Sequence, residues 1–168
     1  MLSKFYKLIP RPVVLVTTID KDRKINAAPF SFISPLSFNP PLIMISSAKE
    51  RHTYQNIKET KEFVLNIIDE SWLEKALVCA KNFPKGINEL EEAGLSWEEC
   101  EKVKPPRVKE AKAWIECKFK EEKEEGDHFI LIGEVVNFGG SIENLNLVFH
   151  IGMQEFLIGK EKKYYKWF

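Results

Sequence analysis

The sequence predicts a mainly β fold with added helices, arranged as a closed or nearly closed barrel. Six or more segments have the apolar composition or the two-residue alternation of strands. The helical segments are inserted between the first four strands and the last hairpin, whereas regular strand–helix alternation would indicate a parallel sheet. The length of 168 residues predicts a single domain over residues 1–168.

Four strands are predicted in the first part of the chain. Residues 13–19 (VVLVTTI) form a continuous β-branched run, typical of a strand buried on both faces. The polar turn DKDRK joins them to residues 24–34 (KINAAPFSFIS), and so short a turn predicts an antiparallel pair. The third strand, residues 42–46 (LIMIS), follows a break at Asn39-Pro40-Pro41, and residues 62–68 (EFVLNII) form the fourth.

Three helical segments are also predicted. The first begins near Thr53, which we expect to be its N-terminal cap, and it precedes the fourth strand. The other two cover residues 71–83 (SWLEKALVCAKNF) and 86–95 (GINELEEAGL), on either side of a break at Pro84-Lys85-Gly86. These helices belong to the middle of the chain, outside the predicted strands.

The last part of the chain predicts a β-hairpin and one further strand. Apolar and polar residues alternate from 113 to 120, which is the period of a half-exposed strand. The inward set is Ala113, Ile115, Cys117 and Phe119, and the outward set is Trp114, Glu116, Lys118 and Lys120. Glu125-Gly126-Asp127 is the predicted turn of the hairpin, and residues 129–138 form its second strand. The run NLVFHIG predicts the further strand.

Composition excludes several classes of protein. Lysine plus arginine and aspartate plus glutamate number 25 each, so the net charge is zero, which argues against a nucleic-acid-binding protein. No apolar run approaches the ~20 residues that a membrane-spanning helix requires. Three widely spaced cysteines and the lack of a signal-type segment predict reduced thiols and a cytoplasmic location.

Metal-dependent and nucleophilic chemistry are not expected from the motifs. None of the three histidines has a ligand spacing to another histidine or to a cysteine, so we expect no metal site. Cys79 on a predicted helix and Cys117 on the inward face of a strand are typical of small hydrophobic residues. The sequence has no GxSxG or Walker motif, and its eight glycines are scattered.

The segment SSAKERHTYQNI, residues 46–57, is either a polar connecting loop or an anion-binding site. It lies between a buried strand and a helix N-terminus, where free N–H groups and the helix dipole favour a phosphate. Ser46, Ser47 and Thr53 carry hydroxyl donors, and Arg51 carries a fork of donors that matches phosphate oxygens. His128, in EGDHF, is likewise either part of an ordinary turn or a ligand contact at the barrel mouth.

Five segments, in order, resemble the flavin reductase-like family, also called FMN-binding split barrels. They are RPVVLVTTID, NAAPFSFISPLSFNPPLIMIS, RHTYQNI, NFPKGINELEEAGL and EGDHFILIGEV, and the flavoredoxin and archaeal FMN-protein branch is the most similar. The resemblance covers the chain from Arg11 to the last strand. It implies a six-stranded Greek-key barrel and a homodimer with FMN near the subunit interface.

The resemblance also implies a set of site residues. Those expected at the flavin phosphate are Ser46, Ser47, Arg51 and Thr53, with Asn56 there or only supporting the helix start. Those expected along the flavin ring are Asn26, Ser31 and Phe32, with Lys81 approaching from a helical segment. His128 is expected near the ring and the nicotinamide, to orient the nicotinamide or stabilise charge on reduced flavin. The alternatives are that Phe32 is core, that Asn26 ends a turn and that Arg51 is a surface residue.

Two departures from the family pattern leave the reductant and acceptor open. Ser46 occupies the position where ferric-reductase-like members carry a cysteine, and the Arg-Leu-Gly-Gly segment of two-component reductases is missing. Tyr164, Tyr165 and Trp167 end the chain and could pack on a partner subunit or close the barrel.

The expected function is an FMN oxidoreductase that passes electrons from NAD(P)H through FMN to an acceptor. One alternative is an FMN-binding electron carrier reduced by a protein partner. The other is a non-catalytic dimeric barrel whose cofactor site has decayed.

Overall fold

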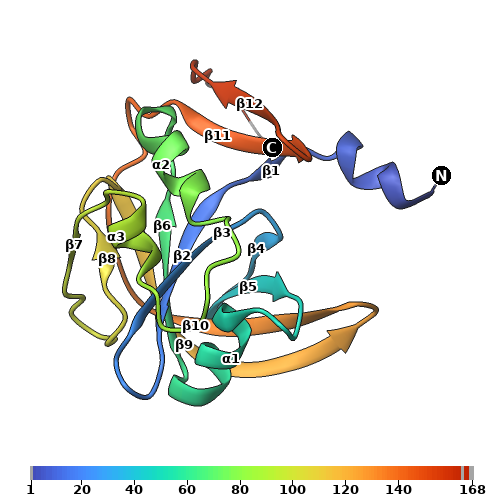
Figure 1. Ribbon diagram of the computed structural model, residues 1–168. Helices are drawn as coiled ribbons and strands as arrows, with labels where there is room; N and C mark the ends of the chain where they lie inside the picture. The colour runs from blue at the N-terminus through green and yellow to red at the C-terminus, as the bar shows by residue number, and fades with distance from the viewer. Residues whose placement is uncertain (1, 164, 167–168) are drawn as a thin grey trace.

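The computed structural model describes residues 2–163 and 165–166, and its main sheet is an antiparallel barrel (Figure 1). The strand order is β3-β2-β6-β9-β10-β5-β4, and every neighbouring pair is antiparallel. The strands are β2 (Val14–Ile19), β3 (Ile25–Phe30), β4 (Ile33–Phe38), β5 (Pro41–Ser47), β6 (Glu62–Ile67), β9 (Ala113–Glu125) and β10 (His128–Gly140). The mainly β class and the split-barrel fold are therefore confirmed.

The predicted second strand is in fact two strands, so the sheet has seven strands where six were expected. The chain bends at Ser31 and Phe32, leaving β3 at one edge of the sheet and β4 at the other. At the bend, the N–H of Ser46 donates to the carbonyl of Phe32 at 2.8 Å. Local apolar composition does not reveal this bend, because both halves of the run are apolar, while β3 pairs back onto β2 and β4 pairs forward onto β5.

A second, smaller sheet lies outside the barrel. It contains β1 (Arg11–Pro12), β11 (Leu147–Gly152) and β12 (Glu155–Gly159), with β11 in the middle. The N-terminal 3₁₀ helix η1 (Leu2–Leu8) projects away from the barrel beside the tip of the β11–β12 hairpin (Figure 1). Two short strands, β7 (Trp97–Glu98) and β8 (Arg107–Val108), pair on the opposite side of the molecule.

The helices are shorter than the sequence predicts. The elements are α1 (His52–Thr60), η2 (Glu70–Trp72), α2 (Leu73–Val78) and α3 (Glu89–Glu92). Helix α3 begins late because Asn88 caps it, its side chain accepting from the N–H of Leu90 at 3.1 Å. Thr53 is not the cap of α1 as predicted: Arg51 occupies the N-cap position and no side chain caps this helix. None of the helices in the described part of the chain is long and apolar enough to cross a membrane.

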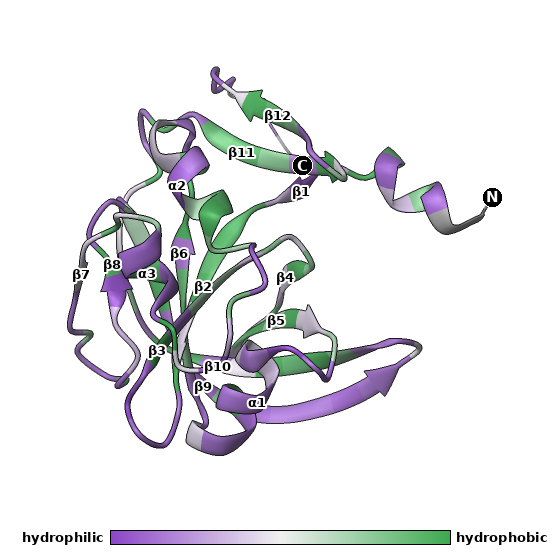
Figure 2. Cartoon of the chain, in the orientation of Figure 1, coloured by the Kyte–Doolittle hydropathy of each residue, from purple (hydrophilic) through white to green (hydrophobic). Residues whose placement is uncertain are grey.

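Two apolar clusters hold the barrel together. All six residues of β2 are buried, which confirms the two-sided burial predicted from its β-branched run. One cluster, with Val14, Phe63 and Leu131, fills the barrel, and the other, with Leu15 and Leu90, lies under α2 and α3. Figure 2 shows hydrophobic colour along β10 and hydrophilic colour along the outer part of β9, where the hairpin extends beyond the core.

The predicted alternation in β9 fails at Glu116. This residue was expected to face outward, but it is buried. Its carboxylate accepts from the N–H of Lys102 at 2.7 Å, the N–H of Glu101 at 3.4 Å and the side-chain amide of Asn137 at 2.9 Å. The polar segment before β8 folds over this face of the strand, so the carboxylate is buried with hydrogen-bond donors around it.

Candidate functional site

One cavity of about 890 Å³ brings the predicted site residues together. Every one of them except Asn56 lines it. Its walls come from β3, the bend before β4, the end of β5, the first turn of α1, the segment after α2, the start of β10 and the tip of the β11–β12 hairpin. Cofactor sites are typically single concave cavities of ~300–1,000 Å³, and this cavity falls in that range.

One end of the cavity has the features of an anion-binding site. Strand β5 ends with Ser46 and Ser47, and α1 starts five residues later with its first turn facing the same cavity. Because no side chain caps α1, its first N–H groups remain available as donors. The exposed guanidinium of Arg51 forms no side-chain hydrogen bond or ion pair within the described part of the chain. The uncapped helix end and the free cation together favour an anion.

Planar side chains form the adjoining wall. The rings of Phe32 and His128 lie 5.5 Å apart between centroids at an angle of 45°, and Phe32 is 40% exposed. Phe32 is therefore a cavity-wall residue and does not belong to the core. His128 Nδ1 lies 2.7 Å from the carboxylate of Asp127, and this hydrogen bond holds the pKa of Asp127 below its ordinary value.

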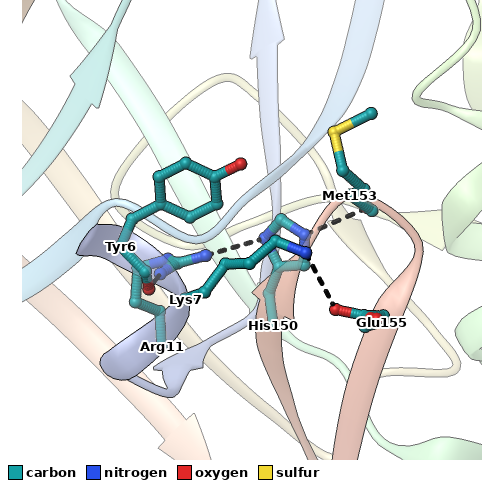
Figure 3. A network of polar contacts seen from close by, with 6 residues as sticks. All are labelled: Tyr6, Lys7, Arg11, His150, Met153 and Glu155. Carbon is teal, nitrogen blue, oxygen red and sulfur yellow. Dashed lines mark hydrogen bonds and ion pairs between the residues drawn. The ribbon is translucent and has the colours of Figure 1, made fainter. Parts of the chain in front are cut away.

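A polar network that the sequence did not indicate closes another wall (Figure 3). Arg11 Nη2 lies 3.3 Å from His150 Nδ1, which is also 3.1 Å from the hydroxyl of Ser31. A guanidinium can only donate, so His150 Nδ1 is the acceptor and the ring proton is on Nε2, which lies 3.1 Å from the carbonyl of Met153. This tautomer ties β1, β3–β4 and the β11–β12 hairpin together.

Arg11 also holds the N-terminal segment against the cavity. Its Nη1 donates to the carbonyls of Tyr6 and Ile9, the latter at 2.9 Å. The guanidinium lies over the ring of Tyr6 at 5.4 Å and over that of Phe32 at 5.6 Å. The only sequence signals for this network are a polar His150 inside an apolar run and an arginine just before the first predicted strand, residues 13–19.

Asn26, which was predicted, and Glu89, which was not, form the deep part of the cavity. Asn26 lies in β3 opposite Thr18, so it does not simply end a turn. Glu89 is buried at the start of α3, and its Oε2 accepts from the N–H of Ala27 at 2.9 Å. Burial raises the pKa of the Glu89 carboxyl. In the sequence, Glu89 is one of several glutamates in a helical segment, which gave no sign of its burial.

Two other predicted residues occupy different environments. Asn56 lies on the buried face of α1, where its Nδ2 donates to Thr18 Oγ1 at 3.1 Å, so it supports the helix and does not line the cavity. Lys81 is exposed at the cavity rim after α2. Of the aromatic tail, Tyr165 is exposed, while Tyr164 and Trp167 lie outside the described residues.

The cysteines do not add a reactive thiol to the cavity. Cys79 lines it but is buried, and its Sγ donates to the carbonyl of Glu89 at 3.4 Å. The pKa of the Cys79 thiol is raised to about 12, mainly by burial and to a smaller extent by the charge of Glu89. Cys117 is buried in the barrel core as predicted. Within residues 2–163 and 165–166, no group of three or more His, Cys, Asp or Glu side chains could hold a metal ion.

Comparison with known proteins gives the same fold. A relative from Aquifex aeolicus (strain VF5) is 40% identical over 134 residues, which cover 77% of this chain and 68% of the relative. The crystal structure of nitrilotriacetate monooxygenase component B from Bacillus cereus superposes with a TM-score of 0.86 at 32% identity, covering 98% of this chain and 94% of that one. Flavoredoxin of Desulfovibrio vulgaris (Miyazaki F) shares the fold, with a TM-score of 0.85 at 23% identity over 94% of this chain and 91% of its own.

The family assignment rests on a match along most of the chain. The profile of the flavin reductase like domain matches residues 5–155, from the helix η1 to the start of β12. This range includes every residue that the sequence analysis placed in the candidate site. Membership implies a flavin cofactor and supports an oxidoreductase activity. The chain belongs to the flavin reductase-like domain family.

Proposed function

We propose that this protein is an FMN-binding oxidoreductase that passes electrons from NAD(P)H through FMN to an acceptor. The observation that carries the proposal is the pairing of an anion-binding site with a wall of planar side chains in one cavity. The uncapped end of α1 and the unpaired Arg51 fit a phosphate. Phe32 and His128 fit a flat ring system beside it.

The residues present fit FMN in size and in chemistry. The volume of about 890 Å³ lies in the upper part of the range of ~300–1,000 Å³ that is typical of ligand and cofactor sites. Three hydroxyl-bearing residues, Ser46, Ser47 and Thr53, line the anion-binding end, and the hydroxyl of Ser47 donates to the carbonyl of Ala48 at 3.1 Å. A single phosphate matches this single anion-binding site, which favours FMN over a dinucleotide flavin.

When bound, FMN would supply the hydride and electron transfer chemistry. The role of the chain would be to bind and orient the flavin and to exclude water from the site. Arg51 and the first turn of α1 would hold the phosphate, while Asn26 and Ser31 would offer hydrogen bonds along the ring edge. His128, held by Asp127, would orient the nicotinamide of the reductant.

Absorbance spectra of the purified protein test this proposal directly. We expect a flavin spectrum, or its appearance on titration with FMN, and bleaching of the yellow band on anaerobic addition of NADH or NADPH. FMN binding without bleaching by either nucleotide would indicate an electron carrier reduced by a protein partner. A colourless protein that takes up no FMN would contradict the proposal and favour a decayed site.

We also propose a cytoplasmic homodimer. Several large apolar side chains at the projecting end of the molecule are solvent-exposed in the single chain, and a second copy would cover them. They are Phe5, Leu8 and Ile9 near η1, and Met153 and Leu157 in the β11–β12 hairpin. Light scattering coupled to gel filtration should give a mass of about 39 kDa, twice the 19.5 kDa of the chain. All three cysteines are free, as in a reducing compartment.

A further inference from the structure

Three buried polar side chains form a line from the interior to the anion-binding end of the cavity. They are Glu89 of α3, Asn26 of β3 and Thr53 of α1, with exposed fractions of 5%, 8% and 1%. One end of the Asn26 amide lies 3.2 Å from Glu89 Oε1, and the other end lies 3.1 Å from Thr53 Oγ1. Thr53 is in the first turn of α1, at the proposed phosphate site.

An ionised Glu89 dictates one arrangement of this line. A carboxylate can only accept, so the NH₂ group of Asn26 must face Glu89. Asn26 Oδ1 then faces the N–H of Ala27, at 3.2 Å, and the hydroxyl of Thr53. Thr53 therefore donates its hydrogen to Asn26 and presents only lone pairs to the cavity. Lone pairs repel a phosphate oxygen.

A protonated Glu89 dictates the opposite arrangement. The carboxylic acid donates to Asn26 Oδ1, and the NH₂ group turns to Thr53 Oγ1 at 3.1 Å and to Thr18 Oγ1 at 3.4 Å. Thr53 accepts this hydrogen bond, and its own hydrogen is free to point into the cavity. The two patterns differ in one proton and in a flip of the Asn26 amide. In the second pattern the NH₂ group lies 3.2 Å from the nitrogen of Ala27, whose N–H then donates to Glu89 Oε2 alone.

We propose that Glu89 is a positioning residue of the cofactor site, which acts through Asn26 and makes Thr53 a phosphate donor when FMN binding takes up a proton. The inference rests on the proposed function. Burial raises the pKa of Glu89, so protonating its carboxylate when the phosphate dianion binds costs less free energy than it would for an exposed glutamate. Glu89 has no ion-pair partner in the described part of the chain. The titratable side chain in contact with this residue is Cys79, whose Sγ lies 3.4 Å from the Glu89 carbonyl, and His52 and Lys81 line the same cavity.

The test is the pH dependence of the FMN dissociation constant, measured by flavin fluorescence from about pH 5 to about pH 9. We expect the dissociation constant of the wild type to rise by up to about tenfold per pH unit above the pKa of Glu89. Glu89→Gln should remove this rise, because its amide donates to Asn26 Oδ1 and its carbonyl accepts from Ala27. Identical profiles for wild type and Glu89→Gln would overturn the inference.

Matched controls separate this effect from others. Glu91→Gln, exposed on the same helix, should keep the wild-type profile. The phosphate of FMN itself titrates near pH ~6, but it does so equally in all variants. Thermal unfolding checks that the variants are folded.

Two further measurements distinguish the relay from simple charge repulsion and from failure of the proposed function. Thr53→Val removes the hydroxyl through which Glu89 is proposed to act. The FMN dissociation constants of Thr53→Val and of the double variant Thr53→Val/Glu89→Gln should therefore depend on pH in the same way. A remaining difference between them would mean that Glu89 acts directly on the phosphate, which overturns the relay. If neither the wild type nor Glu89→Gln binds FMN at any pH, the proposed function fails instead.

Discussion

His150 accepts a hydrogen bond from Arg11 at 3.3 Å across 139 positions of the sequence. The pair joins the first strand of the chain to its second-last strand and lies in the wall of the cavity. Arg11 also binds the carbonyls of Tyr6 and Ile9, so the position of the N-terminal segment depends on it.

Arg11→Ala should therefore loosen the N-terminal segment. Arg11 donates to two backbone carbonyls and to His150, and losing these contacts should lower the free energy of unfolding by about 1–3 kcal/mol. Hydrogen exchange of residues 2–10 should become faster. Lys7→Ala is the control, because its ion pair with Glu155, at 3.3 Å, is exposed and contributes only ~0–1 kcal/mol. Equal effects of the two substitutions would contradict the role of Arg11.

Arg51→Ala should weaken FMN binding. A charge-assisted contact to phosphate contributes about 1.5–3 kcal/mol, so the dissociation constant should rise by about 10- to 150-fold. Fluorescence titration measures it, with Arg23→Ala as the control because Arg23 lies in the turn between β2 and β3, outside the cavity lining. An unchanged dissociation constant would remove Arg51 from the phosphate site.

His128→Ala should slow the reduction of bound FMN by NAD(P)H more than it weakens FMN binding. The ring packs against Phe32 at a tilt of 45° in the cavity wall, where we place the nicotinamide. Stopped-flow absorbance gives the reduction rate and fluorescence titration the affinity. Glu134→Ala, exposed farther along β10, should change neither. Equal losses of rate and affinity in His128→Ala would argue against a role at the nicotinamide.

Glu116→Ala should destabilise the barrel. The substitution leaves the N–H groups of Glu101 and Lys102 and the amide of Asn137 without their acceptor. A buried donor without a partner costs about 1–3 kcal/mol, so denaturant unfolding should show at least that loss. Lys118→Ala, two residues along the same strand and exposed, should unfold like the wild type.

Glu89→Gln should change how stability depends on pH. In the folded protein, burial raises the pKa of Glu89 above its ordinary value of 4.5, so the folded state binds more protons than the unfolded state between those two pKa values. Wild-type stability relative to Glu89→Gln should therefore fall as pH rises from 4.5 through the raised pKa, and then level off. Parallel curves of unfolding free energy against pH for the two proteins would contradict a raised pKa.

Local sequence patterns determined much of this protein. The β-branched run of β2, the Glu125-Gly126-Asp127 turn and the polar segment before α1 each follow from residues close together in the chain, whose periodicity and turn chemistry do not depend on distant partners. For the same reason, residues 46–53 could be predicted from the sequence as a candidate anion-binding segment, and the structure brings Ser46, Ser47, Arg51 and Thr53 to one cavity. The five family segments added the residues expected along the ring.

Tertiary structure alone decided the features that depend on distant partners. The bend at Ser31 and Phe32 separates the β2–β3 hairpin from the β4–β5 hairpin, and these hairpins join the sheet through distant strands, β2 through β6 and β5 through β10. Glu116 is buried because a loop folds over an otherwise ordinary polar position. Glu89 becomes part of the cavity because α3 packs on β3, 62 positions away, and supplies an acceptor for Ala27. A burial state or a hydrogen-bond partner is a property of two segments, so neither segment's sequence contains it.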